Sequence, residues 1–199
     1  MSDVAEGFVP NRVKHRWAFI EMLASSVLGL IASLVLSADA VVLAANPDAD
    51  LSCNISDKIS CATVGLTWQA NLLGFPNAFL GLIAEPVVIT IAVASLGGVW
   101  FPRWFMVSAQ VVYTIGLAFA YWLFYEAYFV IGALCPWCLL ITVTTTVVFF
   151  SMTRVNVLDG NLGSWLQRKL SYPMRVGADA AVGVILIAIL SAMVLYRYL

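Results

Sequence analysis

The fold is decided by residues 127–153, AYFVIGALCPWCLLITVTTTVVFFSMT, a stretch without a single Lys, Arg, Asp or Glu. A helix crosses the hydrocarbon core of a bilayer with about 20 consecutive apolar residues. This stretch is long enough to span a membrane, and it also carries two of the four cysteines of the chain. It predicts a membrane-spanning helix with a Cys-Pro-Trp-Cys sequence in its first turns.

The composition of the chain excludes an ordinary soluble domain. Of the 199 residues, 62% are hydrophobic and 11% are charged, and the mean hydropathy is +0.96. Soluble domains carry about 25% charged residues. A formal net charge of −1 gives no electrostatic footprint for nucleic acid, and a single His argues against a histidine-based metal site.

The remaining charge-poor stretches predict four more spans. A backbone in hydrocarbon must satisfy its own hydrogen bonds, and no alternating pattern indicates a barrel, so the spans are expected to be helices. We predict an all-α integral membrane protein in which residues 1–199 form a single membrane domain. Its five transmembrane helices are expected near residues 17–40, 76–100, 104–126, 133–153 and 175–197.

Two segments allow a second interpretation. Residues 158–172 are expected to form a short cytoplasmic interfacial helix, the alternative being a merely polar connector. The first span, with its basic leader, imitates a cleavable signal peptide, but its apolar run is longer than the h-region of such a peptide.

The basic residues predict the orientation, because cytoplasmic loops carry the excess of Lys and Arg. With the N-terminus inside, eight basic residues are cytoplasmic and two are external. The segment between the first two spans is then external and contains Asp39, Asp48, Asp50 and Asp57. The eight are Arg12, Lys14, Arg16, Arg103, Arg154, Arg168, Lys169 and Arg175, and the two are Lys58 and Arg197.

All four cysteines lie on the external side in this topology, where disulfides form and persist. Cys53 and Cys61 fall in the external loop, and Cys135 and Cys138 fall at the start of the fourth span. Two residues between cysteines is the spacing of redox dithiols, in which one sulfur attacks and the other resolves a mixed disulfide. Unpaired amides at a helix N-terminus favour the reactive thiolate.

Three interpretations of the cysteines remain open on spacing alone. A tetrathiolate zinc site requires four converging sulfurs in an oxidising compartment. Two structural disulfides would include a bridge that closes a very short turn and constrains little of the unfolded chain. We favour a relay, in which electrons pass from an external dithiol to Cys53 and Cys61, then to Cys135 and Cys138.

The ordered motifs resemble those of the vitamin K epoxide reductase homologues, whose bacterial members are quinone-coupled, disulfide-forming enzymes. The resemblance covers residues 17–153. In the DsbB type of quinone-linked enzyme the close cysteine pair comes first, and the order here is the reverse. The matching residues are Cys53, Ile59-Ser60-Cys61, Gly74-Phe75-Pro76-Asn77 with Gly81, and Cys135-Pro136-Trp137-Cys138.

The resemblance implies a four-helix-bundle catalytic core over 17–153. The hydropathy and charge pattern adds a cytoplasmic linker or interfacial helix over 154–174 and a fifth transmembrane helix over 175–197. The resemblance also implies that Cys53 exchanges with a thioredoxin-like partner, that Cys61 passes electrons to Cys135, and that Cys138 is the thiolate that reduces a quinone. Asn77 matches the amide that hydrogen-bonds a quinone carbonyl, and its alternative role is a helix N-cap.

The chain departs from the family at two places. Many bacterial members carry a fused thioredoxin-like domain after the fifth span, which this sequence does not contain, so a separate extracytoplasmic, DsbA-type partner is expected. The vertebrate enzymes place a Tyr where Thr142 stands. Thr142 lies on the same helix face as Cys138 and is a candidate quinone contact, the alternative being a Thr that bonds its own helix backbone.

Three further residues are candidates for the quinone site or its proton supply. Trp68 and Phe79 are candidates for lining and covering the quinone ring, although interfacial aromatics are more often packing residues. Glu85 lies within the second span, where a carboxylate is by default a functional suspect. It is a candidate proton route, the alternative being a group that stays protonated or pairs within the bundle.

The sequence therefore predicts a plasma-membrane thiol oxidase that passes electrons from its partner to menaquinone or ubiquinone, with no metal. The external loop is expected to move so that Cys61 reaches the Cys135–Cys138 disulfide. Reduction of vitamin K epoxide uses the same sulfurs and is the first alternative. A non-enzymatic membrane subunit with structural disulfides is the second.

Overall fold

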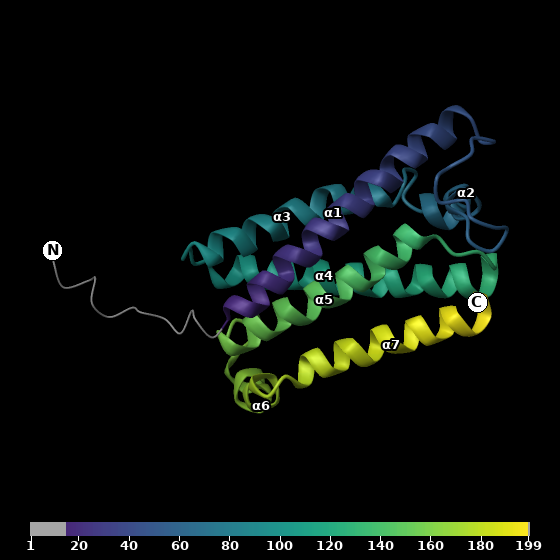
Figure 1. The fold of residues 1–199 in the computed structure, drawn as a ribbon. Helices are drawn as coiled ribbons and strands as arrows, with labels where there is room; N and C mark the ends of the chain where they lie inside the picture. The colour runs from purple at the N-terminus through teal and green to yellow at the C-terminus, as the bar shows by residue number, and fades with distance from the viewer. Residues whose placement is uncertain (1–14, 199) are drawn as a thin grey trace, which may run out of the picture.

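The computed structural model describes residues 15–198, and they form an all-helical bundle (Figure 1). Within these residues, five helices are long and apolar enough to cross a membrane, which confirms the predicted fold class. Arg12 and Lys14, which contribute to the predicted charge bias, lie outside the described residues. The five helices are α1 (Arg16–Ala45), α3 (Ala78–Leu96), α4 (Arg103–Tyr125), α5 (Pro136–Leu158) and α7 (Ala178–Tyr198).

Shorter elements connect these helices. The loop after α1 contains α2 (Cys61–Gly65) and the 3-10 turn η2 (Trp68–Asn71), and a π-helical segment η3 (Glu126–Ile131) continues α4. A separate helix, α6 (Ser164–Arg175), lies between α5 and α7 at the end of the bundle where α1 begins. The segment predicted near 158–172 is therefore helical, but it starts later because α5 continues to Leu158.

The first helix is longer than predicted. The predicted span stopped at residue 40, just after Asp39, whereas α1 runs on to Ala45. Residues 40–45, AVVLAA, contain no helix breaker. The Asp39 carboxylate does not end the helix, because it turns toward the cysteine loop rather than into lipid.

The core is built where α1 packs against α3 and α5. Small residues allow the close approach, since a Cβ placed on Gly81 of α3 would lie 2.0 Å from Ser33 Oγ of α1. Nearer the start of α1, Met22 of this helix, Ile91 of α3 and Met152 of α5 are fully buried. The fifth transmembrane helix is tied to the core by a two-pronged ion pair between Arg154 of α5 and Asp179 of α7.

Replacing Gly81 with Ala is expected to destabilise the bundle by about 1–3 kcal/mol, because the added methyl group overpacks the α1–α3 contact. Thermal unfolding in detergent measures this. Gly116→Ala is the matched control, since a Cβ there meets nothing within 4 Å. Ser33→Ala should partly rescue Gly81→Ala by removing the clashing oxygen. Equal stability of the two glycine variants would contradict the close packing.

Candidate active site

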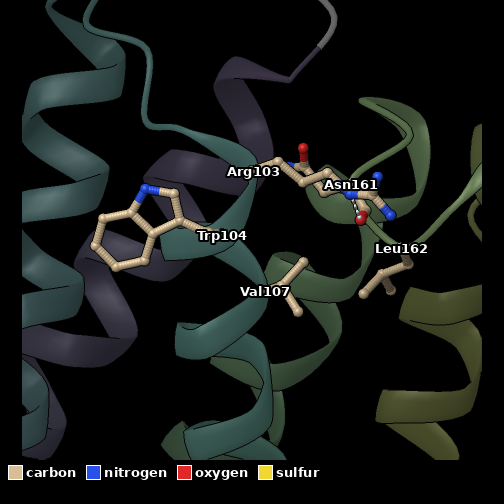
Figure 2. Close-up of a pocket in the computed structure, with 5 residues that line it drawn as sticks. All are labelled: Arg103, Trp104, Val107, Asn161 and Leu162. Carbon is tan, nitrogen blue, oxygen red and sulfur yellow. Dashed lines mark hydrogen bonds between the residues drawn. The ribbon is translucent and has the colours of Figure 1, made fainter.

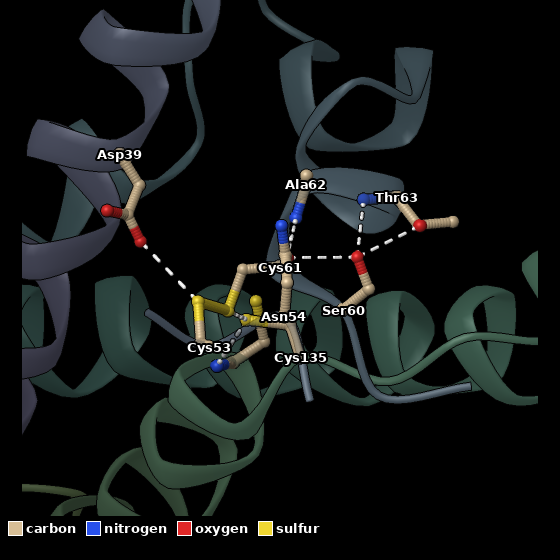
Figure 3. The surroundings of a disulfide bond; sticks show 9 residues. Asp39, Cys53, Asn54, Ser60, Cys61, Ala62, Thr63 and Cys135 are labelled. Carbon is tan, nitrogen blue, oxygen red and sulfur yellow. Dashed lines mark hydrogen bonds between the residues drawn. A yellow bond between two sulfur atoms is a disulfide. The ribbon is translucent and has the colours of Figure 1, made fainter. Parts of the chain in front are cut away.

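The four cysteines gather at one end of the bundle, where α1 ends and α5 begins, which we call the cysteine end. Cys53 and Cys61 are joined by a disulfide bond within the loop after α1. Cys135 and Cys138 are free thiols at the start of α5. The structure therefore brings together the two cysteine pairs that the sequence analysis singled out, and Figure 3 shows Cys135 beside the Cys53–Cys61 disulfide.

Backbone hydrogen bonds between the loop and Leu134, the residue before Cys135, determine how the two cysteine pairs lie relative to each other. Leu134 donates its N–H to the carbonyl of Lys58 (2.9 Å), and its own carbonyl accepts from Ser60 N–H (3.0 Å). The residues that follow, Cys61 and Cys135, are thereby held side by side. Their sulfur atoms lie 3.4 Å apart, which is the separation of reacting atoms poised for exchange.

Asn54 closes the loop beside the disulfide. Its Oδ1 accepts hydrogen bonds from the Ser60 hydroxyl (3.0 Å) and from the backbone N–H of Ala62 (3.2 Å). Ser60 in turn caps the first turn of α2 by accepting from Thr63 N–H. These bonds fix the segment that carries Cys61 relative to Cys53 without involving the thiols of α5.

The start of α5 favours a thiolate at Cys135. Cys135 is the N-cap residue of this helix, and its sulfur accepts a hydrogen bond from the backbone N–H of Cys138 (3.3 Å). The side chain of Cys138, together with the amides of Cys138 and Trp137, lowers the pKa of Cys135, against burial and the negative charge of Asp39. A thiol with a lowered pKa is a good leaving group in disulfide exchange.

The disulfide is sealed from solvent. Cys53, Cys61 and Cys135 are only 6%, 3% and 2% exposed, and they share a buried apolar cluster with Leu43 and Leu51. The sequence analysis led us to expect a loop movement that brings Cys61 to Cys135. In this arrangement the two sulfurs are already in contact, so an opening is needed instead to expose Cys53 to a partner protein.

Comparison with protein-family models identifies the family. Residues 20–153 match the model of the vitamin K epoxide reductase family. The chain belongs to this family. The matched range contains all four cysteines and runs from Ile20 of α1 to Thr153 of α5, and so through most of the first four transmembrane helices. Comparison with individual curated proteins gives no match.

Membership in the vitamin K epoxide reductase family carries two consequences. The protein is a multi-pass membrane protein, and its family implies redox chemistry between disulfides and quinones in the membrane. For the zinc interpretation, the described residues offer one cluster of potential metal ligands. It consists of Asp39, Cys53 and Cys61, whose potential ligand atoms lie within 4.8 Å of one another. Two of these three atoms are bonded to each other in the disulfide.

Asn77 lies directly before α3 and makes no side-chain capping bond, so the N-cap role is not what occupies its side chain. Its Nδ2 donates to the carbonyl of Gln69 in η2 (2.6 Å). Its Oδ1 is buried without a hydrogen-bond partner among the described residues. A buried, unpartnered amide oxygen suits a ligand that carries a hydroxyl group, as a reduced quinone does.

The structure gives less support to the other predicted quinone contacts. Trp68 is 62% exposed and packs against Trp122 of α4, and Phe79 stacks on Phe75. The Thr142 hydroxyl donates to the carbonyl of Cys138 (3.0 Å), which confirms that it bonds its own helix. Its hydrogen is therefore not available to a quinone carbonyl in this rotamer.

Glu85 is buried in the middle of the bundle rather than among the cysteines. It accepts a hydrogen bond from the Tyr113 hydroxyl of α4 (3.0 Å), and its other oxygen lies against Gly29 of α1 and beside Thr144 of α5. The carboxyl group therefore pairs within the bundle, which was one of the two interpretations of this residue.

Two cavities lie at the opposite end of the bundle. One, of about 370 Å³, lies between the start of α4 and the turn after α5 (Figure 2). A neighbouring cavity of about 720 Å³ is lined by residues that include His15 and Arg175. Neither contains a cysteine or Asn77, so these cavities are separate from the redox residues.

Sequence reasoning missed two contacts at the site. Asp39 was counted only as an external acidic residue, and its Oδ2 lies 3.6 Å from Cys53 Sγ. The one sequence feature that could have pointed to this contact is the position of Asp39, an acidic residue at the edge of an apolar run. Asn54 had no signal except its position beside Cys53, because its role depends on contacts formed by the folded loop.

The thiol pKa of Cys135 should depend on the hydrogen-bond donor at position 138. Cys138→Ser and Cys138→Ala each leave Cys135 as the sole free thiol in the protein with an intact loop disulfide. The serine hydroxyl replaces the donor, whereas alanine removes it, so the pKa of Cys135 should be higher in the alanine variant. Thiolate absorbance against pH measures the difference, and identical titration curves would contradict the assigned cause.

Proposed function

We propose that the protein is a quinone-dependent thiol oxidase that generates disulfide bonds outside the cytoplasm. Electrons pass from a separate, DsbA-type thioredoxin-like protein to Cys53 and Cys61, then to Cys135 and Cys138, and finally to a membrane quinone. The single observation that carries this proposal is the 3.4 Å contact between Cys61 and Cys135, which joins the two pairs.

The first step takes place at the loop. A thiolate of the partner attacks Cys53 and forms a mixed disulfide, and the electron pair of the broken bond leaves with Cys61 as a thiolate. The second thiol of the partner then attacks this mixed disulfide and the partner leaves as a disulfide. The proton of that thiol passes to Cys53, which is left as a thiol. Because Cys53 is 6% exposed, this step requires the loop around Leu51 to open outward.

The second step takes place between the pairs. The Cys61 thiolate attacks Cys135 of an oxidised Cys135–Cys138 bridge and releases Cys138. When Cys53 then attacks Cys61, the loop disulfide forms again and Cys135 leaves as a thiolate, which its position at the N-terminus of α5 stabilises. The resulting dithiol carries two electrons for the quinone.

The quinone site is proposed at Asn77, with Cys138 as the reducing thiol. The unpartnered Oδ1 of Asn77 supports a hydroxyl-bearing product there. Trp68 and Phe79 flank the start of α3, and Thr142 lies one turn beyond Cys138 on the same face of α5. The acceptor is menaquinone or ubiquinone, which supplies the oxidising capacity, and Glu85 is proposed as a proton reserve within the bundle.

The proposed location is the plasma membrane, with the N-terminus in the cytoplasm and the cysteines outside. The distribution of charge along the helices supports this orientation. Arg16, Arg103 and Arg154, as well as α6 with its three basic residues, lie toward the end of the bundle opposite the cysteines. Cytoplasmic faces carry such an excess of positive charge.

Anaerobic quinone absorbance tests the proposal with purified protein and a reduced thioredoxin-like substrate. We expect quinone reduction matched to substrate oxidation, and its loss in Cys138→Ala, because that variant lacks the final thiol. Gly116→Ala serves as a matched control that should keep activity.

Two results would contradict the oxidase proposal. Reduction of vitamin K epoxide without quinone reduction would favour the reductase. Absence of both activities, together with loss of stability in Cys138→Ala, would favour a structural role for the cysteines.

A further inference from the structure

Asp39 is the only carboxylate shown in contact with a cysteine sulfur among the described residues. It projects from α1 toward the loop disulfide, with Oδ2 3.6 Å from Cys53 Sγ (Figure 3). A disulfide sulfur has no hydrogen to donate, so in this state the contact is not a hydrogen bond. It becomes one when Cys53 is a thiol, since the separation suits an S–H group and a carboxylate oxygen.

The carboxylate has no ionic partner that would give it a purely structural role. Among residues 15–198, no basic side chain forms an ion pair with Asp39. It is half-buried beside the apolar cluster of Leu43, Leu51 and Cys53. A carboxylate next to apolar side chains costs free energy unless it is paired or hydrogen-bonded.

The relay contains a step that needs a proton acceptor at this point. Cys53 must attack as a thiolate to displace Cys135 from Cys61. It is 6% exposed, so water and buffer have little access to its S–H group. Other ionisable groups close by are Cys61 and Cys135, and each of these is engaged in the mixed disulfide at that moment.

We propose that Asp39 is a catalytic general base that removes the proton from Cys53 when the loop disulfide is formed again. This assignment deepens the proposed thiol oxidase and rests on it. The S–H bond of Cys53 breaks and its proton moves to Asp39 Oδ2. The Cys53–Cys61 bond forms, the Cys61–Cys135 bond breaks, and its electron pair remains on Cys135 as a thiolate. Asp39 then returns the proton to water through its exposed side.

A pre-reduced enzyme separates this step from quinone chemistry. The four reduced cysteines hold two electron pairs, so one protein should form two quinols when mixed with excess quinone. The first quinol draws on Cys135 and Cys138 alone. The second requires transfer from the loop pair and therefore requires Cys53 to lose its proton.

In Asp39→Asn, stopped-flow absorbance should show an unchanged first phase and a second phase slowed about a hundredfold, the scale of general-base catalysis. Asp48→Asn is the matched control, because it removes an exposed carboxylate from the loop that carries Cys53, and both of its phases should be normal. In Asp39→Ala, added formate should restore part of the second phase, which a purely structural role of Asp39 would not allow.

The other outcomes overturn the assignment. A normal second phase in Asp39→Asn means that another group takes the proton, and slowing of both phases means that Asp39 supports the fold. If the wild-type protein forms no quinol, the proposed quinone-dependent function is wrong, whatever the role of Asp39.

The role of Asp39 is then tested without quinone. One equivalent of diamide oxidises Cys135 and Cys138 of the reduced protein. Acid quench with thiol mapping then follows the transfer of this disulfide to Cys53 and Cys61 in wild type and Asp39→Asn.

Discussion

A backbone pairing of three residues aligns the two cysteine pairs, because Leu134 bonds to both Lys58 and Ser60. This pairing links two segments that enter the cysteine end from different sides of the bundle. It places Cys61 against Cys135 and so determines which member of each pair exchanges with the other. A shift of one residue would point a different side chain at the start of α5 and would break the path between the pairs.

The same pairing is weak enough to be compatible with loop opening. Two backbone hydrogen bonds contribute about 0.5–1.5 kcal/mol each to stability. The cysteine end has only a small apolar cluster. The main core, around Met22, Ile91 and Met152, lies closer to the opposite end of the bundle. The loop is thus attached firmly enough to align the sulfurs and loosely enough to release Cys53 without unfolding the helices. Cys135 and Cys138 lie at the start of α5, and Cys53 and Cys61 lie on the loop.

The sequence was sufficient for the helices because hydrophobic length decides which segments cross a membrane. It predicted five spans and the Cys-Pro-Trp-Cys start of α5, and the resemblance predicted the family. It failed at the end of α1, where Asp39 was interpreted as the end of an apolar run. It also implied a moving loop for the transfer to Cys135, because the bonds of Leu134 to residues distant in sequence leave no periodic signal. The partners of Glu85 were equally hidden, since Tyr113 comes to it from another helix.

The most direct test of the central claim is disulfide mapping in the variant Cys53→Ala, Cys138→Ala, which keeps only Cys61 and Cys135. Mass spectrometry of the protein oxidised within intact membranes should find these two residues joined in nearly every molecule, because their sulfurs are in contact in the folded state. Two free thiols under the same oxidising conditions would show that the pairs do not meet, and the relay would then be wrong.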